Sequence, residues 1–148
     1  MIKKRVLFVC TGNTCRSPMA EVILKNKLKQ LGIKNVKVSS AGLCAQDGDK
    51  MSENSLLALK ELGYRAFGFR SKRLTMKMLL ETDLVICMTK SHKLSIGVFE
   101  NVYTLSELTG LLDVSDPYGQ DLNFYVKTSH QIEDACNVLI EKFISDKE

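Results

Sequence analysis

The sequence predicts an α/β protein with three layers, in which a four-stranded parallel sheet carries helices on both faces and a tight loop follows strand 1. Two observations predict this class. Short continuous apolar runs, typical of strands buried on both faces of a sheet, alternate with segments of helical apolar spacing. Such alternation favours right-handed crossovers and a parallel sheet. The 148 residues, 45% of them hydrophobic, indicate one domain over residues 1–148.

The opening segment reads as strand, tight loop and helix. Residues 5–10 form a continuous apolar run, and the loop of residues 11–17 follows it at once. Apolar side chains at helical spacing come next, and Gly32 has the position of a left-handed C-terminal cap. We expect Ser17 to be the N-cap of this helix, with Pro18 at its first position.

The rest of the chain supplies three more strands and three more helical segments. We expect strands at residues 36–41, 84–88 and 102–105. Helical spacing predicts a helix at 52–62 that ends at Gly63, a short turn at 75–80 and a long helix at 122–143. The long helix carries one apolar stripe, formed by Leu122, Tyr125, Ile132, Ala135, Cys136, Leu139 and Phe143.

Charge and hydropathy argue against several classes of protein. The formal net charge is only +4 and the charged residues, 26% of the chain, are mixed along it, so we expect no nucleic-acid partner. The apolar runs are too short for a membrane span, and the first residues do not resemble a signal peptide. We therefore expect a cytoplasmic protein without a membrane partner, whose mild positive charge favours anionic substrates.

The cysteines argue against a disulfide framework and against zinc. Their number is odd and their spacing irregular, in contrast to small secreted proteins. The chain has no Cys-x2-Cys pair, and its two histidines, His92 and His130, are far apart in sequence. We expect no metal and no other cofactor.

Cys10 stands where a strand ends and a helix is about to begin. Backbone N–H groups and the positive end of a helix dipole stabilise a thiolate there, and Arg16 adds a positive charge. Gly12 and Asn13 tolerate the positive φ angles that turn successive N–H groups inward. The loop therefore predicts an anion nest with a nucleophile at its floor and a bidentate guanidinium at its rim, which together indicate a phosphate site.

A phosphoryl transfer to sulfur also needs an acid that protonates the leaving group. Asp116 lies in the segment Asp-Pro-Tyr-Gly between the fourth strand and the last helix, and this segment can return to the same edge of the sheet. Asp113 and Asp121 compete for the role, although Asp121 is better suited to cap the final helix. Tyr118 is the candidate wall of the pocket.

These motifs resemble the low-molecular-weight protein tyrosine phosphatases over essentially the whole chain. Residues 6–21 resemble the family's phosphate loop, and Asp116-Pro117 resembles its general-acid motif. The resemblance extends to Ser40-Ala41-Gly42, to the strand from Asp83 to Met88 and to the closing helix.

The resemblance implies the roles of individual residues. Cys10 would form a phosphocysteine, Arg16 would bind the phosphoryl oxygens, and Asp116 would act as acid and then as base. Ser17 would hydrogen-bond the thiolate. Asn13 would hold the loop shape with support from Ser40. The phosphate-binding set also takes in Thr11, Gly12, Thr14, Cys15 and Tyr118.

Position 69 departs from the family pattern, whereas position 15 follows it. Many members have a histidine near position 69 that helps hold the loop asparagine, whereas this chain has Phe69. Cys15 corresponds to the family's second loop cysteine, which forms a reversible disulfide with the nucleophile; the alternative for Cys15 is a packing role.

The residue at position 14 bears on the choice of phosphoamino acid. Tyrosine-specific members commonly have a bulky aliphatic there, whereas Thr14 resembles the bacterial protein-arginine phosphatases. A hydroxyl can hydrogen-bond polar atoms near the phosphorus, and its branched body narrows the slot against a ring. The resemblance thus implies a cysteine-dependent protein phosphatase, acting on phosphoarginine or phosphotyrosine in proteins.

Three other classes share parts of the pattern. An arsenate reductase of the same fold needs further resolving cysteines near the third strand, where this chain has only Cys87. A phosphocysteine carrier does not need the hydrolytic acid that Asp116 would supply. A non-catalytic anion-binding module would bind phosphate without turnover.

Overall fold

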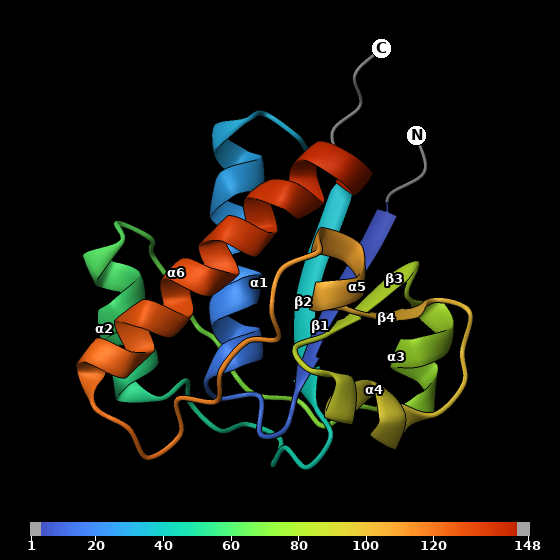
Figure 1. Ribbon diagram of the computed structural model, residues 1–148, viewed down its shortest axis with the longest axis horizontal. Coiled ribbons are helices and arrows are strands. Elements are labelled where there is room, and N and C mark those ends of the chain that lie inside the picture. The colour runs from blue at the N-terminus through green and yellow to red at the C-terminus, as the bar shows by residue number, and fades with distance from the viewer. Residues whose placement is uncertain (1–3, 145–148) are drawn as a thin grey trace.

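A computed structural model describes residues 4–144 of the chain, and its centre is a parallel sheet of four strands (Figure 1). The strands are β1 (Lys4–Cys10), β2 (Val36–Gly42), β3 (Leu84–Cys87) and β4 (Val102–Thr104). Their order is β2-β1-β3-β4, and every neighbouring pair is parallel. Since β1 is a central strand, its buried apolar run has a sheet neighbour on each side. The predicted three-layer α/β class is confirmed.

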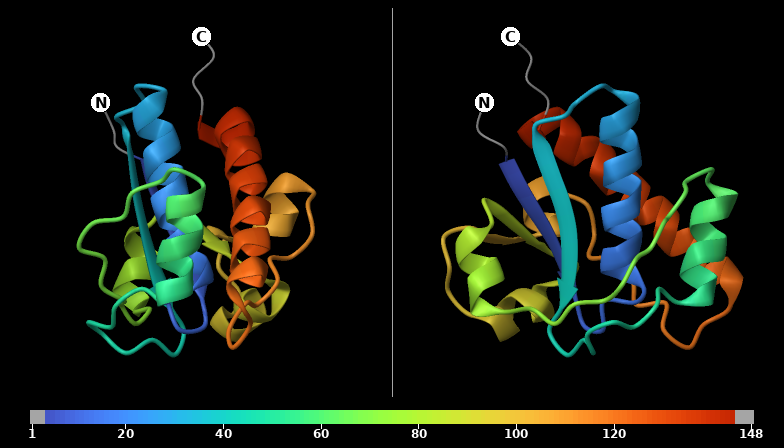
Figure 2. Two further views of the ribbon diagram at one scale, coloured as in Figure 1. Left: turned by 90° about the vertical axis from the view of Figure 1, so that its left-hand side faces the viewer. Right: turned by 180° about the vertical axis from the view of Figure 1, so that it is seen from behind.

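Helices cover one face of the sheet in a large apolar cluster. They are α1 (Arg16–Gln30), α5 (Leu105–Thr109) and α6 (Leu122–Leu139), and α2 (Glu53–Glu61) packs against α1 and α6 beyond the sheet (Figure 1). Phe8 of β1 and Ile86 of β3 point into this cluster, where they meet Met19 and Ile23 of α1 and Ile132 of α6. In Figure 2, α1 lies against the sheet and α6 crosses it.

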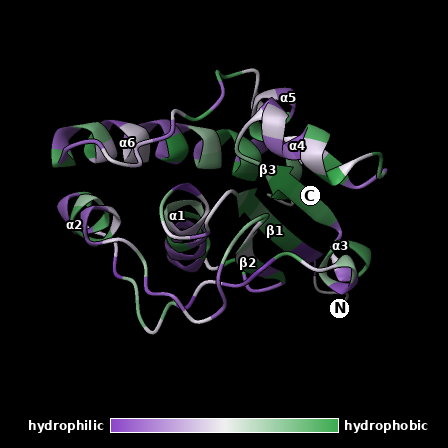
Figure 3. Ribbon diagram, turned by 90° about the horizontal axis from the view of Figure 1, so that it is seen from below, coloured by the Kyte–Doolittle hydropathy of each residue, from purple (hydrophilic) through white to green (hydrophobic). Residues whose placement is uncertain are grey.

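The opposite face is covered by a thinner layer. Leu7 and Val9 of β1 pack with Leu79 of α3 (Met76–Glu81), and Ile96 at the end of α4 (Lys90–Ile96) packs at the margin of the same cluster. Figure 3 shows the apolar strands between α1 and α6 on one side and α3 on the other. The alternation of Leu7, Phe8 and Val9 between the two clusters explains why the run had to be apolar throughout.

The structure corrects the expected start of the first helix. Helix α1 begins at Arg16, and its N-cap residue Cys15 makes no side-chain capping bond. Ser17 therefore lies inside the first turn, where its hydroxyl contacts Sγ of Cys10 at 2.9 Å instead of capping the helix. Because the Ser17 hydroxyl contacts Cys10 and Asn13, it does not accept a hydrogen bond from the N–H groups at the start of α1.

Two short helices are absent from the sequence prediction. Helix α4 follows Thr89, whose hydroxyl accepts from the N–H of His92, and α5 follows Thr104, which forms a capping box with Glu107. Both helices are too short for apolar periodicity to be recognised, so their signal lies only in the capping threonines. The strand expected to end at residue 105 ends at Thr104, because Leu105 opens α5.

The other helix boundaries are close to their predictions. Ser52 caps α2, Asp121 caps α6, and Gly32 and Gly63 have positive φ just beyond α1 and α2. The last helix is regular only as far as Leu139 and continues as a π-helical segment, η1 (Ile140–Ile144). Phe143 lies in that segment and is 37% exposed, so the apolar stripe is less buried at its end than expected. Within residues 4–144, none of the helices is long and apolar enough to cross a membrane.

Candidate active site

The loop between β1 and α1 forms the floor of the site at the carboxyl edge of the sheet. Its carbonyl groups face outward: those of Cys10, Thr11 and Thr14 accept from the N–H groups of residues 43, 44 and 52 respectively. Within the described part of the chain, the N–H groups of residues 11–15 donate to no protein acceptor. These donors are therefore available to the oxygen atoms of an anion.

Asn13 gives the loop its turn, because it is the one non-glycine residue with positive φ (54°) between residues 4 and 144. Gly12, which was expected to share this conformation, lies outside the positive-φ region. Asparagine tolerates the left-handed region better than other side chains. The side chain of Asn13 is also fully buried, so its amide needs hydrogen-bond partners.

Three partners satisfy the amide of Asn13. Its Nδ2 donates to Oγ of Ser17 and to Oγ of Ser40, each at 2.9 Å, and its Oδ1 accepts from the backbone N–H of Lys72 at 2.9 Å. Although this chain has Phe69 where many family members have a supporting histidine, the backbone N–H of Lys72 supports the amide of Asn13. The Ser40 hydroxyl in turn donates to Glu21 at 2.6 Å, and Glu21 forms an ion pair with Lys25.

Gly42 allows the end of β2 to lie directly against the loop. A Cβ at this position would lie 2.7 Å from the carbonyl oxygen of Thr11 and 2.8 Å from the nitrogen of Asn13. Both atoms belong to the backbone, so no side chain could rotate away to make room. Only glycine fits here, and the motif Ser40-Ala41-Gly42 does not by itself reveal this close approach.

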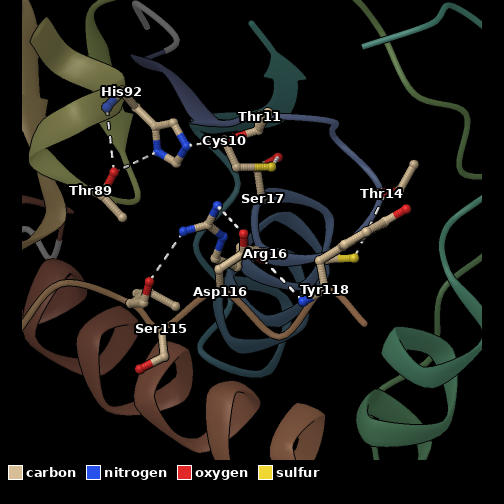
Figure 4. A network of polar contacts seen from close by, with 12 residues as sticks. Cys10, Thr11, Thr14, Arg16, Ser17, Thr89, His92, Ser115, Asp116 and Tyr118 are labelled. Carbon is tan, nitrogen blue, oxygen red and sulfur yellow. Dashed lines mark hydrogen bonds and ion pairs between the residues drawn. The ribbon is translucent and has the colours of Figure 1, made fainter. Parts of the chain in front are cut away.

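The sulfur of Cys10 lies beneath this loop, next to a hydroxyl (Figure 4). Its Sγ is 2.9 Å from Oγ of Ser17, and both side chains are buried. Since the Ser17 hydroxyl already accepts from Asn13, it can donate its one hydrogen to the sulfur, which at 2.9 Å is closer than its other acceptor, the carbonyl of Ala41 at 3.5 Å. A thiolate there would receive a charge-assisted hydrogen bond.

Arg16 and Asp116 meet on the other side of the site (Figure 4). The guanidinium of Arg16 is 3.6 Å from a carboxylate oxygen of Asp116 and donates to the carbonyl of Val114 at 3.3 Å. Arg16 is buried, whereas the side chain of Asp116 is 58% exposed. The carboxylate therefore stands at the mouth of the site, where an incoming substrate would meet it.

The three candidate acids have different surroundings. Asp113 accepts from the backbone N–H of Lys90, and Asp121 accepts from that of Phe124 as the cap of α6. Only Asp116 lines the cavity over the loop, a space of about 260 Å³ bounded by Cys10, Thr11, Gly12, Thr14, Cys15, Arg16, Asp116 and Tyr118. Asp116 also accepts from the N–H of Tyr118, which fixes the turn that carries both residues.

His92 is a residue of the site that sequence reasoning did not place. Its Nε2 lies 3.0 Å from the hydroxyl of Thr11, and its Nδ1 lies 3.1 Å from the hydroxyl of Thr89. Burial lowers the pKa of His92 to about 4, and the charge of Arg16 acts in the same direction. The ring is therefore a neutral link between α4 and the loop. Because α4 itself was not predicted, no signal in the sequence pointed to this contact.

Cys15, the second loop cysteine, is a free thiol whose contacts lie toward α2 and α6. Its Sγ is 3.6 Å from the hydroxyl of Ser52 and 3.5 Å from that of Tyr125. Burial, followed by the contact with Cys15, raises the pKa of Tyr125 to about 12. Cys87 in β3 is fully buried in the apolar cluster on the other face of the sheet, and burial raises the pKa of its thiol to about 12, as is typical of a packing cysteine.

Comparison with known proteins agrees with this geometry. The family model for low molecular weight phosphotyrosine protein phosphatase matches residues 5–148. A protein-arginine-phosphatase of Bacillus subtilis is 37% identical over 96% of this chain and 98% of its own. The structure of a low molecular weight protein tyrosine phosphatase from T. tengcongensis has a TM-score of 0.89 and 42% identity, covering 95% of this chain and all of that one.

A further solved structure is described as an arginine phosphatase with a cysteine-to-serine mutation and a phosphorylated active-site serine. It is 36% identical to this chain, with a TM-score of 0.88 and 97% of each chain covered.

The buried neutral ring of His92 predicts a pH-dependent stability. As pH falls from 6.5 toward 4, an unfolded histidine binds a proton that the folded protein excludes, so stability falls. Between pH 7.5 and pH 5, the free energy of unfolding in urea should fall by about 2 kcal/mol more in wild type than in His92→Asn. The control His130→Asn replaces a surface histidine and should behave as wild type. An equal pH dependence of the unfolding free energy in all three proteins would contradict the low pKa of His92.

Proposed function

This chain belongs to the low-molecular-weight phosphotyrosine protein phosphatase family, and we propose that it is a protein-arginine phosphatase with Cys10 as its nucleophile. Its relatives are protein phosphatases, which remove phosphate from proteins, and the chain is a cysteine-dependent protein phosphatase. One observation supports the assignment of the site: Cys10, Arg16, Asp116 and the loop with unused N–H groups line one cavity, and the hydroxyl of Ser17 contacts the sulfur of Cys10 from behind.

The first chemical step transfers the phosphoryl group to sulfur. The Cys10 thiolate attacks phosphorus, an S–P bond forms, and the bond from phosphorus to the leaving nitrogen or oxygen breaks. Asp116 gives its proton to the leaving atom. The loop N–H groups and Arg16 hold the equatorial oxygens, which carry the developing charge.

The second step regenerates the enzyme. Water attacks the phosphocysteine, its proton passes to the Asp116 carboxylate, and the S–P bond breaks to release inorganic phosphate and the thiolate. The Ser17 hydroxyl stabilises the departing thiolate, which it contacts in the free protein. The 58% exposure of Asp116 allows one carboxyl group to serve both the leaving group and the water.

Two features support phosphoarginine over phosphotyrosine. Thr14 lines the cavity wall, where the N–H of Ser52 donates to its backbone carbonyl and its hydroxyl lies 3.8 Å from Sγ of Cys15. The exposed carboxylate of Asp116 also suits a leaving group that departs as a guanidinium. A relative 37% identical to the chain is a protein-arginine-phosphatase.

We further propose that the enzyme works in the cytoplasm as a single domain over residues 1–148 without a cofactor. The thiol and carboxyl groups of the cavity are sufficient for both steps. A reducing compartment keeps Cys10 available as a nucleophile, which supports this location.

Substrate preference is tested with phosphoarginine and phosphotyrosine peptides of one sequence. Wild type should release phosphate faster from phosphoarginine. Thr14→Ile should lower that preference by at least 10-fold, because an apolar branch replaces the hydroxyl and suits a phenyl ring. Thr14→Val keeps the shape without the hydroxyl and therefore separates the two effects. A faster wild-type reaction with phosphotyrosine, unchanged by Thr14→Ile, would refute the preference.

The acid role of Asp116 predicts a dependence on the leaving group. Asp116→Asn should slow hydrolysis of substrates with poor leaving groups by about 100-fold or more. An activated aryl phosphate should be affected less in the cysteine-phosphorylation step, which a stopped-flow burst measures. Asp113→Asn is the matched control. If Asp113→Asn shows this pattern and Asp116→Asn does not, the acid has been assigned to the wrong residue.

We propose that Cys15 protects the nucleophile from irreversible oxidation. A sulfenic acid at Cys10 would condense with the Cys15 thiol, with loss of water, to give a disulfide. Activity lost to mild peroxide should then return with dithiothreitol in wild type. Cys15→Ser should keep its basal activity but recover much less. Equal recovery by the two proteins would leave Cys15 with the packing role that its contacts to Ser52 and Tyr125 describe.

A further inference from the structure

A second cavity lies behind the phosphate loop, between α1 and the chain that joins α2 to α3. It measures about 480 Å³, larger than the cavity over Cys10, and is within the range of small-molecule sites. Figure 2 shows the connecting chain running past α1 and the end of β2. Nothing in the phosphatase reaction uses this space.

The lining of this cavity is cationic. Lys25, Arg65, Arg70 and Lys72 line it together with one carboxylate, Glu21. Glu21 is already occupied, because it accepts from Ser40 and forms an ion pair with Lys25, both at 2.6 Å. Among the described residues, Arg65, Arg70 and Lys72 form no salt bridge. The cavity therefore offers three unpaired positive charges to an anion.

The cavity also has an exposed aromatic side chain next to these positive charges. Phe67 lines the cavity with 79% of its surface exposed, and the guanidinium of Arg65 lies 5.2 Å from the centre of its ring. A flat ring stacked there would cover apolar surface that is now in water and would extend the cation–π contact. An anion that carries an aromatic ring matches both features.

The cavity is linked to the phosphate loop through the backbone of Lys72. The N–H of Lys72 donates to Oδ1 of Asn13, and its carbonyl accepts from the N–H of Gly42, both at 2.9 Å. Residues 66–70 contain no regular helix or strand and Gly68 has positive φ, whereas Ser71 is buried and hydrogen-bonded to residues 46, 48 and 49. Few local bonds therefore order residues 66–70, which precede the anchored end of the segment. A ligand that holds the side chain of Lys72 would order the donor that shapes the loop.

From this arrangement we propose that the cavity is an effector site for small aromatic anions and that its occupancy strengthens oxyanion binding at the phosphate loop. The ligand orders residues 66–70 and holds the side chain of Lys72, which keeps the Lys72 N–H on Asn13 and the loop N–H groups in their binding geometry. The loop then loses less conformational freedom when it binds an oxyanion. By linkage, an oxyanion at the loop strengthens effector binding by the same factor.

Binding is tested by NMR with naphthalene-1-sulfonate as the probe, and with the phosphate loop saturated by vanadate so that the probe is kept out of it. Saturable shifts are expected for the amides of residues 67–72 and of Asn13. The neutral analogue naphthalene-1-sulfonamide should bind at least 10-fold more weakly. Shifts confined to residues 90–113, or equal affinities for the two probes, would refute the proposed site.

Charge-reversal variants locate the site without touching the catalytic residues. Arg65→Glu combined with Arg70→Glu should weaken probe binding at least 10-fold, and the milder Arg70→Gln should weaken it about 3-fold. Lys34→Glu combined with Lys37→Glu makes the same change of net charge elsewhere on the surface and should stay within 2-fold of wild type. Equal affinity in both double variants would refute the assignment.

Coupling is measured as the affinity for vanadate with and without saturating probe. The probe should strengthen vanadate binding at least 3-fold in wild type and leave it unchanged in the Arg65→Glu, Arg70→Glu variant. An unchanged vanadate affinity in wild type would refute the coupling. Because neither readout involves a phosphorylated peptide, a wrong substrate preference would not affect the result.

Discussion

The buried amide of Asn13 is the interaction on which the rest of the site depends. Asn13 adopts a left-handed backbone conformation, and its side chain joins three parts of the chain: Ser17 on α1, Ser40 on β2 and the backbone of Lys72. Removing any of these partners would leave a buried polar group unsatisfied, which costs about 1–3 kcal/mol. The shape of the loop is thus maintained by tertiary contacts and not by the loop sequence alone.

The hydrogen bonds around Asn13 also determine which group lies next to the sulfur of Cys10. The hydroxyl of Ser17 accepts from Asn13 and contacts the sulfur of Cys10, so the group that fixes the loop also faces this sulfur. Gly42 permits β2 to approach the loop closely enough for Ser40 to join this network. On the far side, the N–H of Val114 donates to the carbonyl of Met88, which holds the segment carrying Asp116 at the end of β3. Cys10 and the segment that carries Asp116 are therefore placed by the ends of β1 and β3, whereas Arg16 opens α1.

Much of this architecture is visible in the sequence because its signals are local. The apolar run before Cys10, the turn residue Asn13 and the caps Ser52 and Asp121 each act through neighbours in the chain. The N-cap at Ser17 was wrong because a tertiary contact, the sulfur of Cys10, takes its hydroxyl. His92 was missed for a related reason.

His92 contacts Thr11 across 81 positions of sequence, from a helix too short to show apolar spacing. The support of Asn13 by Lys72 was equally hidden, because a backbone N–H leaves no mark on residue type. A covalent phosphocysteine at Cys10 is the central claim about the chemistry of this site. Its most direct test is rapid-quench mass spectrometry during turnover. One phosphoryl group should appear on the peptide that contains Cys10 and be lost as substrate runs out, and Cys10→Ser should show no turnover. Turnover without that adduct, or steady hydrolysis by Cys10→Ser, would contradict it.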